Sequence, residues 1–384
     1  IIFQEQVIEV AMNVAGFSSS EAEGLRRAMS RKRSRQALES HHRGFIDGAV
    51  ANGVPEKTAQ SIFEQIIGFS GFGFPKAHSA AFGLLAYQSA WLKVHYGPEY
   101  LSSLLNEQPM GFYPPDSLVQ EARRSGIGIL PPDINASRVE CSAEWSEDPD
   151  LPMVRIGLGY VKGAEASEVE RLVAERDRGG AFRDLGDLAS RMPLRRQELE
   201  QLAWAGALRS LPRGERASGL WSVGLMPHHP ATTAGRQLSL AFEQEEAPDL
   251  EEPEDWARVA AEYGSIGMTL EGHPMALARR DLPKKVLSAA EAVNLPDRST
   301  AEVAGLMVAR QRPETARGVY FVLIEDETGT LNLVVPPPVA ARHRLVIRTA
   351  TMIRARGRIE TSQGVVNLVA ASISELSPQD PAVK

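Results

Sequence analysis

Residues 318–335 read GVYFVLIEDETGTLNLVV, and this stretch decides the fold of the last part of the chain. Valine, isoleucine and leucine gather on both sides of Thr328-Gly329, a pair that favours a tight turn between two strands. Similar runs surround it, namely EVAGLMVARQR at 302–312, TMIRARGRIE at 351–360 and GVVNLVAASIS at 364–374. The pattern predicts five short strands separated by turns.

Five short strands in so little sequence suit a small barrel of the OB type, which we place at residues 299–376. Such barrels bind single-stranded nucleic acid on a basic face with aromatic side chains. Neighbouring residues of a strand point to opposite faces, so we expect Tyr320 to face outward and Phe321 to pack in the core. The candidate DNA contacts are Tyr320, Arg354, Arg356 and Arg358.

Residues 1–105 have the spacing of helices instead. QEQVIEVAMNVAGF predicts one helix that ends at Gly16, and SSEAEGLRRAMS predicts a second that Ser19 or Ser20 caps. Pro55 opens a third helix. After a glycine-rich loop, Ser79 can cap a long apolar helix, AAFGLLAYQSAWLKVHY. This region is therefore predicted to be a helical domain.

Residues 106–210 begin with proline-rich connecting sequence and continue with glycine turns that feed helices. RIGLGYVKGAEASEVERLVAERDRGG and LRRQELEQLAWAGAL resemble tandem helix-hairpin-helix elements, whose backbone N–H groups point at DNA phosphates. An ordinary pair of antiparallel helices with glycine caps fits the same residues. The candidate DNA contacts of the first hairpin are Gly157, Gly159, Lys162 and Gly163.

Length and composition describe a soluble globular protein of two to four domains. The 384 residues are 43% apolar and hold one cysteine, Cys141. A single cysteine excludes an internal disulfide framework and a thiolate zinc site, and it fits a reducing cytoplasm. No segment approaches the roughly 18 apolar residues that span a bilayer. Because the chain starts at Ile1 rather than at Met, we interpret it as a fragment.

The net charge of −7 disfavours nucleic-acid binding, but this value is an average over the whole chain and hides local differences. Residues 26–35, RRAMSRKRSR, hold six basic residues and no acid, whereas residues 243–255 hold eight acids and no base. Residues 211–298 are rich in proline, glycine and acid, so we expect an acidic linker there. That linker would offset basic surfaces in the helical domain and the barrel.

No catalytic motif stands out, because the sequence has no HExxH, GxSxG or Walker loop and no paired carboxylates in a strand-rich acidic setting. Lys76, His78 and Ser79 precede a helix whose free N–H groups could receive a phosphate. The residues alone therefore predict phosphate binding in a chain that is catalytically incomplete.

Two long motifs resemble the fingers domain of bacterial C-family DNA polymerases, the DNA polymerase III alpha subunit group. They are FQEQVIEVAMNVAGFSSSEAEGLRRAMSRKR at 3–33 and FSGFGFPKAHSAAFGLLAYQSAWLKVHY at 69–96. LLNEQPMGFYPPDSLVQEARRSGIGILPPDIN at 104–135 looks most like the error-prone branch, the second DnaE type or ImuC. The resemblance implies a multidomain α+β chain with a helical fingers domain, tandem helix-hairpin-helix elements and an OB barrel.

The resemblance also implies an activity. The whole enzyme would be a nucleotidyltransferase that adds dNTPs to a primer 3′-hydroxyl during translesion synthesis and damage-induced mutagenesis. Mg²⁺ would be held by palm carboxylates that this fragment lacks, so we expect no catalytic residue and no metal here, and no activity from the fragment alone. The dNTP contacts transferred by motif position are Arg26, Arg27, Lys32, Lys76, His78 and Ser79.

Further partners follow from the same resemblance. QLSLAF at 237–242 looks like the hexapeptide that docks bacterial polymerases on the β sliding clamp, although a linker segment packed on its own barrel fits as well. In the error-prone branch the accessory protein ImuB would also bring the clamp. We expect a cytoplasmic, nucleoid-associated protein with primer-template DNA as partner and no membrane. The alternatives are a replicative alpha subunit and a noncatalytic DNA-binding or clamp-tethering protein. The clamp contacts are Gln237, Leu238, Leu240 and Phe242.

Overall fold

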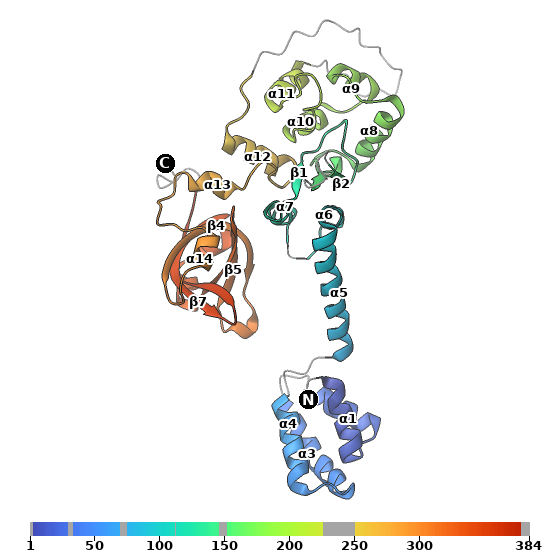
Figure 1. The fold of residues 1–384 in the computed structure, drawn as a ribbon, viewed down its shortest axis with the longest axis vertical. Coiled ribbons are helices and arrows are strands. Elements are labelled where there is room, and N and C mark those ends of the chain that lie inside the picture. Colours follow the sequence, from blue (N-terminus) through green and yellow to red (C-terminus); the bar gives the residue numbers. More distant parts are fainter. Residues whose placement is uncertain are drawn as a thin grey trace. The chain divides into compact units, whose positions relative to one another are not determined.

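The computed structural model describes residues 3–29, 34–69, 75–111, 113–145, 152–225 and 250–377. These residues form two compact units, Ile1–His95 and Tyr96–Lys384, which we call the N-terminal unit and the C-terminal unit (Figure 1). None of the helices in the described ranges is long and apolar enough to cross a membrane.

The N-terminal unit is helical, as predicted. A capping box begins its second helix, because the Ser18 N–H donates to the Glu21 carboxylate (2.8 Å) and the Glu21 N–H donates to Ser18 Oγ (3.3 Å). The cap is therefore Ser18 rather than Ser19 or Ser20. The helices are α1 (Gln4–Ala15), α2 (Ser19–Met29), α3 (Ser34–Ala51), α4 (Glu56–Phe69) and α5 (Lys76–His95).

Helices α1 to α4 share one apolar core, in which Phe45 and Phe63 are fully buried. A Cβ atom at Gly48 would lie 2.1 Å from the carbonyl oxygen of Ala15, so only glycine lets α3 pass α1 this closely. Helix α5 begins three residues before the predicted cap, and the hydroxyl of Ser79 donates to the carbonyl of Pro75 (3.1 Å). Ser79 thus lies inside the first turn.

The first half of the C-terminal unit packs helices around a small sheet. Strand β3 is central, since β1 pairs with it in parallel and β2 in antiparallel orientation. Its elements are α6 (Gly97–Asn106), α7 (Pro115–Arg124), β1 (Gly128–Leu130), β2 (Ser142–Trp145), β3 (Pro152–Arg155), the 3₁₀ turn η1 (Leu158–Tyr160), α8 (Ala166–Gly179), α9 (Leu185–Arg191), α10 (Arg196–Trp204) and α11 (Arg216–Leu225).

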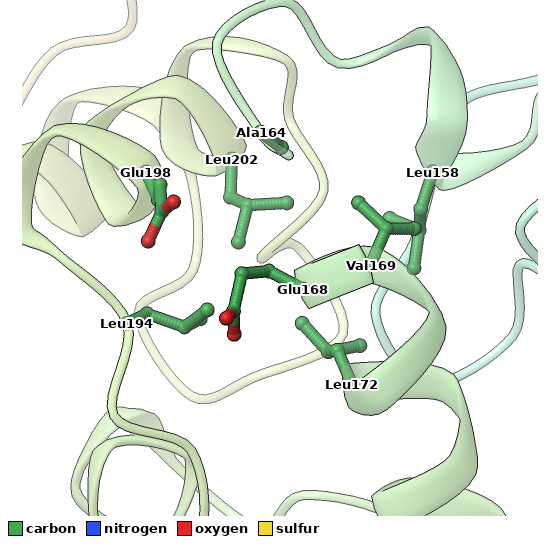
Figure 2. Close-up of a pocket in the computed structure, with 8 residues that line it drawn as sticks. All are labelled: Leu158, Ala164, Glu168, Val169, Leu172, Leu194, Glu198 and Leu202. Atoms are coloured by element: carbon green, nitrogen blue, oxygen red, sulfur yellow. The ribbon is translucent and has the colours of Figure 1, made fainter. Parts of the chain in front are cut away.

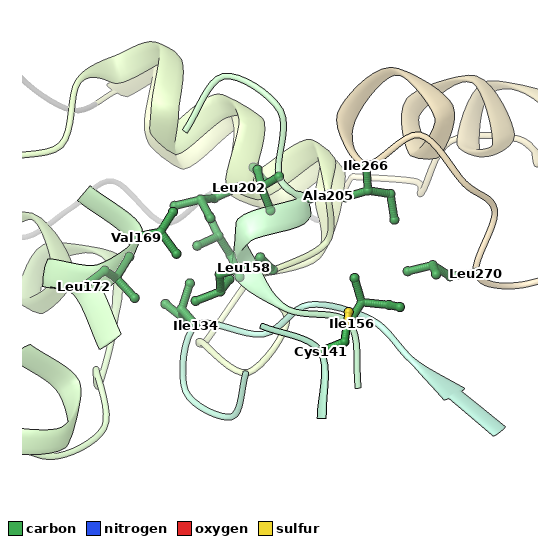
Figure 3. Packing of buried hydrophobic residues seen from close by; sticks show 14 of the residues in the cluster. Ile134, Cys141, Ile156, Leu158, Val169, Leu172, Leu202, Ala205, Ile266 and Leu270 are labelled. Carbon is green, nitrogen blue, oxygen red and sulfur yellow. The ribbon is translucent and has the colours of Figure 1, made fainter. Parts of the chain in front are cut away.

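One core joins these elements to the chain that follows them. Leu158 and Ile134 are fully buried beside the hairpins, and Ile266 and Leu270 enter the same core from the region beyond residue 250 (Figure 3). Burial raises the pKa of the Cys141 thiol, which lies in this core, to about 11.

The expectation of a linker at 211–298 is wrong for its described part. That part forms α11 and then α12 (Asp255–Ser265), α13 (Pro274–Arg279) and α14 (Ala289–Val293), all with buried residues. Residues 250–255 are acidic, but the apolar residues after them supply core contacts that composition alone does not reveal.

The predicted OB-type fold is confirmed by a closed barrel in the order β4-β5-β6-β8-β7. All pairs are antiparallel except β6 with β8. The tight turn lies at Glu327-Thr328, one residue earlier than predicted, and Gly329 already belongs to β6. The elements are β4 (Thr300–Gln311), the 3₁₀ turn η2 (Glu314–Ala316), β5 (Tyr320–Asp326), β6 (Gly329–Val335), α15 (Pro337–Arg342), α16 (Arg344–Thr349), β7 (Met352–Ser362) and β8 (Val365–Glu375).

Candidate nucleic-acid interface

Two of the predicted dNTP contacts lie side by side on α2 and share one carboxylate. Arg26 Nη2 lies 2.7 Å from Glu23 Oε1, and Arg27 Nε lies 3.0 Å from the same oxygen. The two guanidinium groups lower the pKa of Glu23 to about 2. Arg26 and Arg27 are therefore held in place, with part of their charge already compensated.

Lys76 is placed at the first turn of α5, where the sequence predicts a phosphate-binding helix start. Its backbone N–H donates to both carboxylate oxygens of Glu5 on α1 (3.0 and 2.9 Å). This hydrogen bond is the main reason that the pKa of Glu5 is lowered, and the charges of Arg26 and Lys76 act in the same direction. A carboxylate thus occupies the position predicted for phosphate, and it brings Arg26 and Lys76 together.

The other predicted dNTP contacts differ in their surroundings. The ring of His78 lies 4.3 Å from that of Phe82, one turn further along α5. Ser79 donates its hydroxyl to the helix itself, as described above. Lys32 lies outside the described residues, so the structure brings together Arg26, Arg27 and Lys76 but gives no position for Lys32.

The glycines of the first hairpin approach protein backbone closely. A Cβ atom at Gly157 would lie 2.4 Å from the carbonyl oxygen of Val139, and one at Gly159 would lie 2.9 Å from it. These two glycines therefore serve the packing of η1 on the chain around Val139. Gly163 has a φ of +84° and forms the turn that leads into α8.

Lys162, at the tip of this hairpin, is tied to the end of α12. Its Nζ donates to the carbonyl of Tyr263 (2.6 Å), and its backbone N–H donates to the carbonyl of Ser265 (2.7 Å). Both acceptors are neutral, so the ammonium group keeps its full charge at an exposed position.

A buried ion pair fixes the second hairpin, and no sequence pattern predicts it. Arg216 Nη2 on α11 lies 2.8 Å from Glu262 Oε1 on α12, and their side chains are 0% and 1% exposed. The other oxygen of Glu262 accepts the N–H of Leu270 (2.8 Å). Burial nevertheless raises the pKa of Glu262. A spacing of 46 residues carries no pattern by which this pair could be found.

A small cavity lies between the two hairpins (Figure 2). Its volume of about 10 Å³ gives room for about one water molecule, so it is a packing gap rather than a ligand site. It is lined by Leu158, Ala164, Glu168, Val169, Leu172, Leu194, Glu198 and Leu202.

The predicted arginines of β7 stand in a row, and carboxylates lie beside them. Arg354 pairs with Glu302 of β4, and Arg358 Nη2 lies 2.5 Å from Glu360 Oε1. Arg356 is exposed, opposite Glu302 in the pairing of β4 with β7. We call Arg354, Arg356 and Arg358 the β7 row.

The two aromatic residues at the start of β5 are oriented differently from the prediction. Phe321 is 38% exposed, whereas Tyr320 is half-buried and packs against the barrel core. The expectation that Tyr320 is the outer residue was wrong. Side chains still alternate between the two faces of β5, but the barrel register places Val322 and Ile324 in the core. Tyr320, two residues before Val322, therefore lies on the same inner face.

The hairpin region and the barrel are joined by polar contacts. Glu325 of β5, 1% exposed, accepts Arg124 Nη2 of α7 (2.8 Å) and the hydroxyl of Ser117 (3.0 Å). Nearby, the hydroxyl of Tyr263 donates to the buried carboxylate of Asp116 (2.6 Å). Burial raises the pKa of Glu325, so these contacts offset the cost of its charge.

The predicted clamp contacts, Gln237, Leu238, Leu240 and Phe242, lie outside the described residues. In the described ranges, no group of three or more His, Cys, Asp or Glu side chains could hold a metal ion. The sequence did not predict a second group of cations, Arg310, Arg344 and Arg348, at the end of the barrel.

Three family models match this chain. The bacterial DNA polymerase III alpha subunit finger domain matches residues 1–53, the helix-hairpin-helix motif residues 126–218, and the OB-fold nucleic acid binding domain residues 301–376. The three matches follow the order of the elements described above.

Curated relatives match nearly the whole chain. It is 39% identical to the error-prone DNA polymerase of Methylococcus capsulatus over 98% of this chain and 37% of that protein. The error-prone DNA polymerases of Bordetella bronchiseptica and Azoarcus sp. are 40% and 41% identical, each over 98% of this chain and 35% of theirs. The chain therefore spans about a third of the length of these relatives.

Proposed function

Because the chain belongs to the bacterial DNA polymerase III alpha subunit family and resembles its error-prone members, we propose that it is part of an error-prone DNA-directed DNA polymerase. The similarity over 98% of the chain carries this proposal. The whole protein would add dNTPs to a primer 3′-hydroxyl during translesion synthesis and damage-induced mutagenesis. It would act in the cytoplasm at the nucleoid.

In this proposal the N-terminal unit supplies positive charge to the incoming triphosphate. Arg26, Arg27 and Lys76 lie around the two carboxylates of Glu23 and Glu5. A triphosphate carries more negative charge than one carboxylate and offers more oxygens to the forked guanidinium groups, so it can compete for the same cations. Glu23 and Glu5 would then preorganise the cations until the nucleotide arrives.

Hairpins and barrel would hold the primer-template through its phosphates. The exposed ammonium of Lys162 and the turn at Gly163 support this role for the first hairpin. Gly157 and Gly159 would contribute indirectly, because their close backbone packing sets the position of that turn. Phosphate contacts of this kind carry no base specificity and weaken as salt rises.

Mg²⁺ chemistry belongs to another part of the protein in this proposal. The described residues do not fit a two-metal site, since no group of three or more His, Cys, Asp or Glu side chains among them could hold a metal ion. When bound by a palm domain, the ions would activate the primer hydroxyl and stabilise the leaving pyrophosphate. We expect no activity from this chain by itself.

Clamp and ImuB would be protein partners. QLSLAF at 237–242 would place two apolar anchors, Leu240 and Phe242, in a pocket of the β clamp. A pull-down of the chain with β clamp tests this segment. We expect the Leu240→Ala, Phe242→Ala double variant to lose binding to the clamp. Equal binding by the wild type and the double variant would contradict a role of this segment in clamp binding.

Primer extension by the full-length protein tests the polymerase itself. On undamaged template we expect extension, and on a template with an abasic site we expect synthesis past the lesion. Arg27→Ala should raise the dNTP KM roughly tenfold, because it removes one charge-assisted contact. Arg298→Ala is the matched control, since it removes another exposed, ion-paired arginine, which lies in a barrel loop.

The same assay separates the alternatives. A replicative alpha subunit would extend undamaged primers and stop at the lesion. A noncatalytic tethering protein would bind DNA and extend neither template. An unchanged KM and kcat for Arg27→Ala would remove that residue from the nucleotide site.

A further inference from the structure

A pocket at one end of the barrel is lined by three arginines. It has a volume of about 420 Å³, which lies in the range of sites for nucleotide-sized ligands. It opens between the end of β4, the start of β5 and helix α16. The lining residues are Arg310, Tyr320, Arg344, Ile347 and Arg348.

The arginine of β4 is held by neutral groups. Arg310 Nη2 donates to the carbonyl of Ala350 (2.5 Å), and its Nε lies 2.6 Å from the sulfur of Met307. Neither acceptor carries a negative charge. Arg310 is therefore positioned by its neighbours while its positive charge stays uncompensated.

The two arginines of α16 are one helical turn apart. Arg344 and Arg348 are exposed, and Ile347 between them is 2% exposed and anchors the helix on the barrel core. In the part of the chain that the structure describes, neither arginine forms an ion pair with a carboxylate. The pocket thus gathers three guanidinium groups and no acidic side chain.

An aromatic ring lies beside these charges. The guanidinium carbon of Arg312 lies 5.4 Å from the ring centre of Tyr320, which adds a fourth cation next to the pocket. The half-buried ring is fixed against the barrel core, and an aromatic surface beside arginines suits a nucleotide base.

We propose that this pocket, formed by Arg310, Arg344, Arg348 and Tyr320, binds a backbone phosphate of single-stranded DNA. Guanidinium groups match phosphate oxygens with two parallel hydrogen bonds, and three of them converge here without an acid to compete. The inference rests on the proposed function, because a polymerase presents a single-stranded template to its nucleic-acid-binding domains. It moves the main DNA contact of the barrel away from the β7 row.

Binding of a labelled oligothymidine by the 384-residue chain tests the pocket. Fluorescence anisotropy at roughly 50 mM salt should show about tenfold weaker binding for the Arg344→Gln, Arg348→Gln double variant, because two of the three guanidinium groups that hold the phosphate are lost. The matched control is Arg298→Gln, Arg183→Gln, which removes two exposed arginines outside the pocket and should bind like the wild type. Thermal melting checks that each variant is folded.

The outcomes distinguish this inference from the proposed function. If the wild type binds oligothymidine and the double variant binds equally well, the pocket is not the site, although the polymerase proposal stands. If the wild type binds primer-template but not oligothymidine, the inference is wrong and the proposed function stands. If it binds neither, the role proposed for the hairpins and the barrel in holding DNA is wrong as well. In a further outcome, pyrophosphate displaces oligothymidine at a concentration lower than that of the DNA phosphates. That result would show a site for free phosphates and would also overturn the inference. If the melting temperature of the glutamine variant is lowered, the Arg344→Lys, Arg348→Lys variant replaces it. We expect severalfold weaker binding from this variant, because lysine cannot make the paired hydrogen bonds of a guanidinium group.

Discussion

The cations of α2 and those at the barrel end have different neighbours. Arg26 and Arg27 share the carboxylate of Glu23, whereas Arg310 is held by a carbonyl and a thioether. A carboxylate about 3 Å away offsets part of the field that a guanidinium projects into solvent, while a neutral acceptor leaves that field intact. A count of basic residues therefore says less about DNA binding than the identity of each partner does.

The barrel repeats this contrast on a smaller scale. Arg354 and Arg358 of the β7 row each face a glutamate, and Arg344 and Arg348 of α16 face none in the described ranges. Cations paired with carboxylates stabilise the fold or bind DNA only when a phosphate displaces the carboxylate. Unpaired cations can bind a phosphate directly. Three changes test this distinction.

The largest effect is expected at Arg216, the most completely paired cation. Arg216→Ala should lower the free energy of unfolding by about 3–5 kcal/mol, because it leaves the buried carboxylate of Glu262 without its cationic partner. Urea unfolding of the 384-residue chain measures this. Arg171→Ala removes an exposed partner of Glu168 and should cost less than about 1 kcal/mol. Equal losses in the two variants would contradict the distinction.

A second effect concerns the acid of the N-terminal unit. Glu23 should titrate near pH 2 in carboxyl NMR, because Arg26 and Arg27 stabilise its charged form. Its folded pKa is below the ordinary value of 4.5, so its contribution to stability is present above that pH and is lost as the pH falls toward 2. In Arg26→Gln, Arg27→Gln the titration should move toward 4.5. An unmoved titration would mean that the arginines do not hold Glu23.

The smallest effect comes from releasing a paired cation. Glu302→Gln frees Arg354 and should strengthen oligothymidine binding by about threefold, the gain from one weak phosphate contact. Glu375→Gln is the control, since it removes the same charge from the exposed end of β8. If both variants gain equally, net charge rather than pairing sets the affinity.

The sequence predicted the elements better than it predicted their contacts. β-branched runs located the barrel strands, and apolar residues at helical spacing located α1. Helix-start signals at Ser19, Pro55 and Ser79 located α2, α4 and α5. It missed α3, where Gly44 and Gly48 interrupt the helical pattern and one of them permits the close approach to α1. The apolar residues of 250–298 were hidden among acids and prolines, so the packed region was mistaken for a linker.

The site was foreseen only in part, because charge pairing is tertiary. The motifs that resemble the fingers domain located Arg26, Arg27 and Lys76, but nothing in the spacing predicted Glu23 and Glu5 as their partners. The pocket arginines were missed for the same reason. Arg310 and Arg348 are 38 positions apart, and only closure of the barrel brings them to one pocket.

The salt dependence of single-strand binding tests the central distinction most directly. Oligothymidine affinity is measured over a salt series for the wild type, for Arg344→Gln, Arg348→Gln and for Arg354→Gln, Arg358→Gln. Because the pocket holds one backbone phosphate, loss of its two α16 arginines should lower the slope of log affinity against log salt by about 0.7 in the α16 variant. The β7 variant should keep the wild-type slope, because its arginines face Glu302 and Glu360. A lowered slope in the β7 variant with an unchanged slope in the α16 variant would contradict the account.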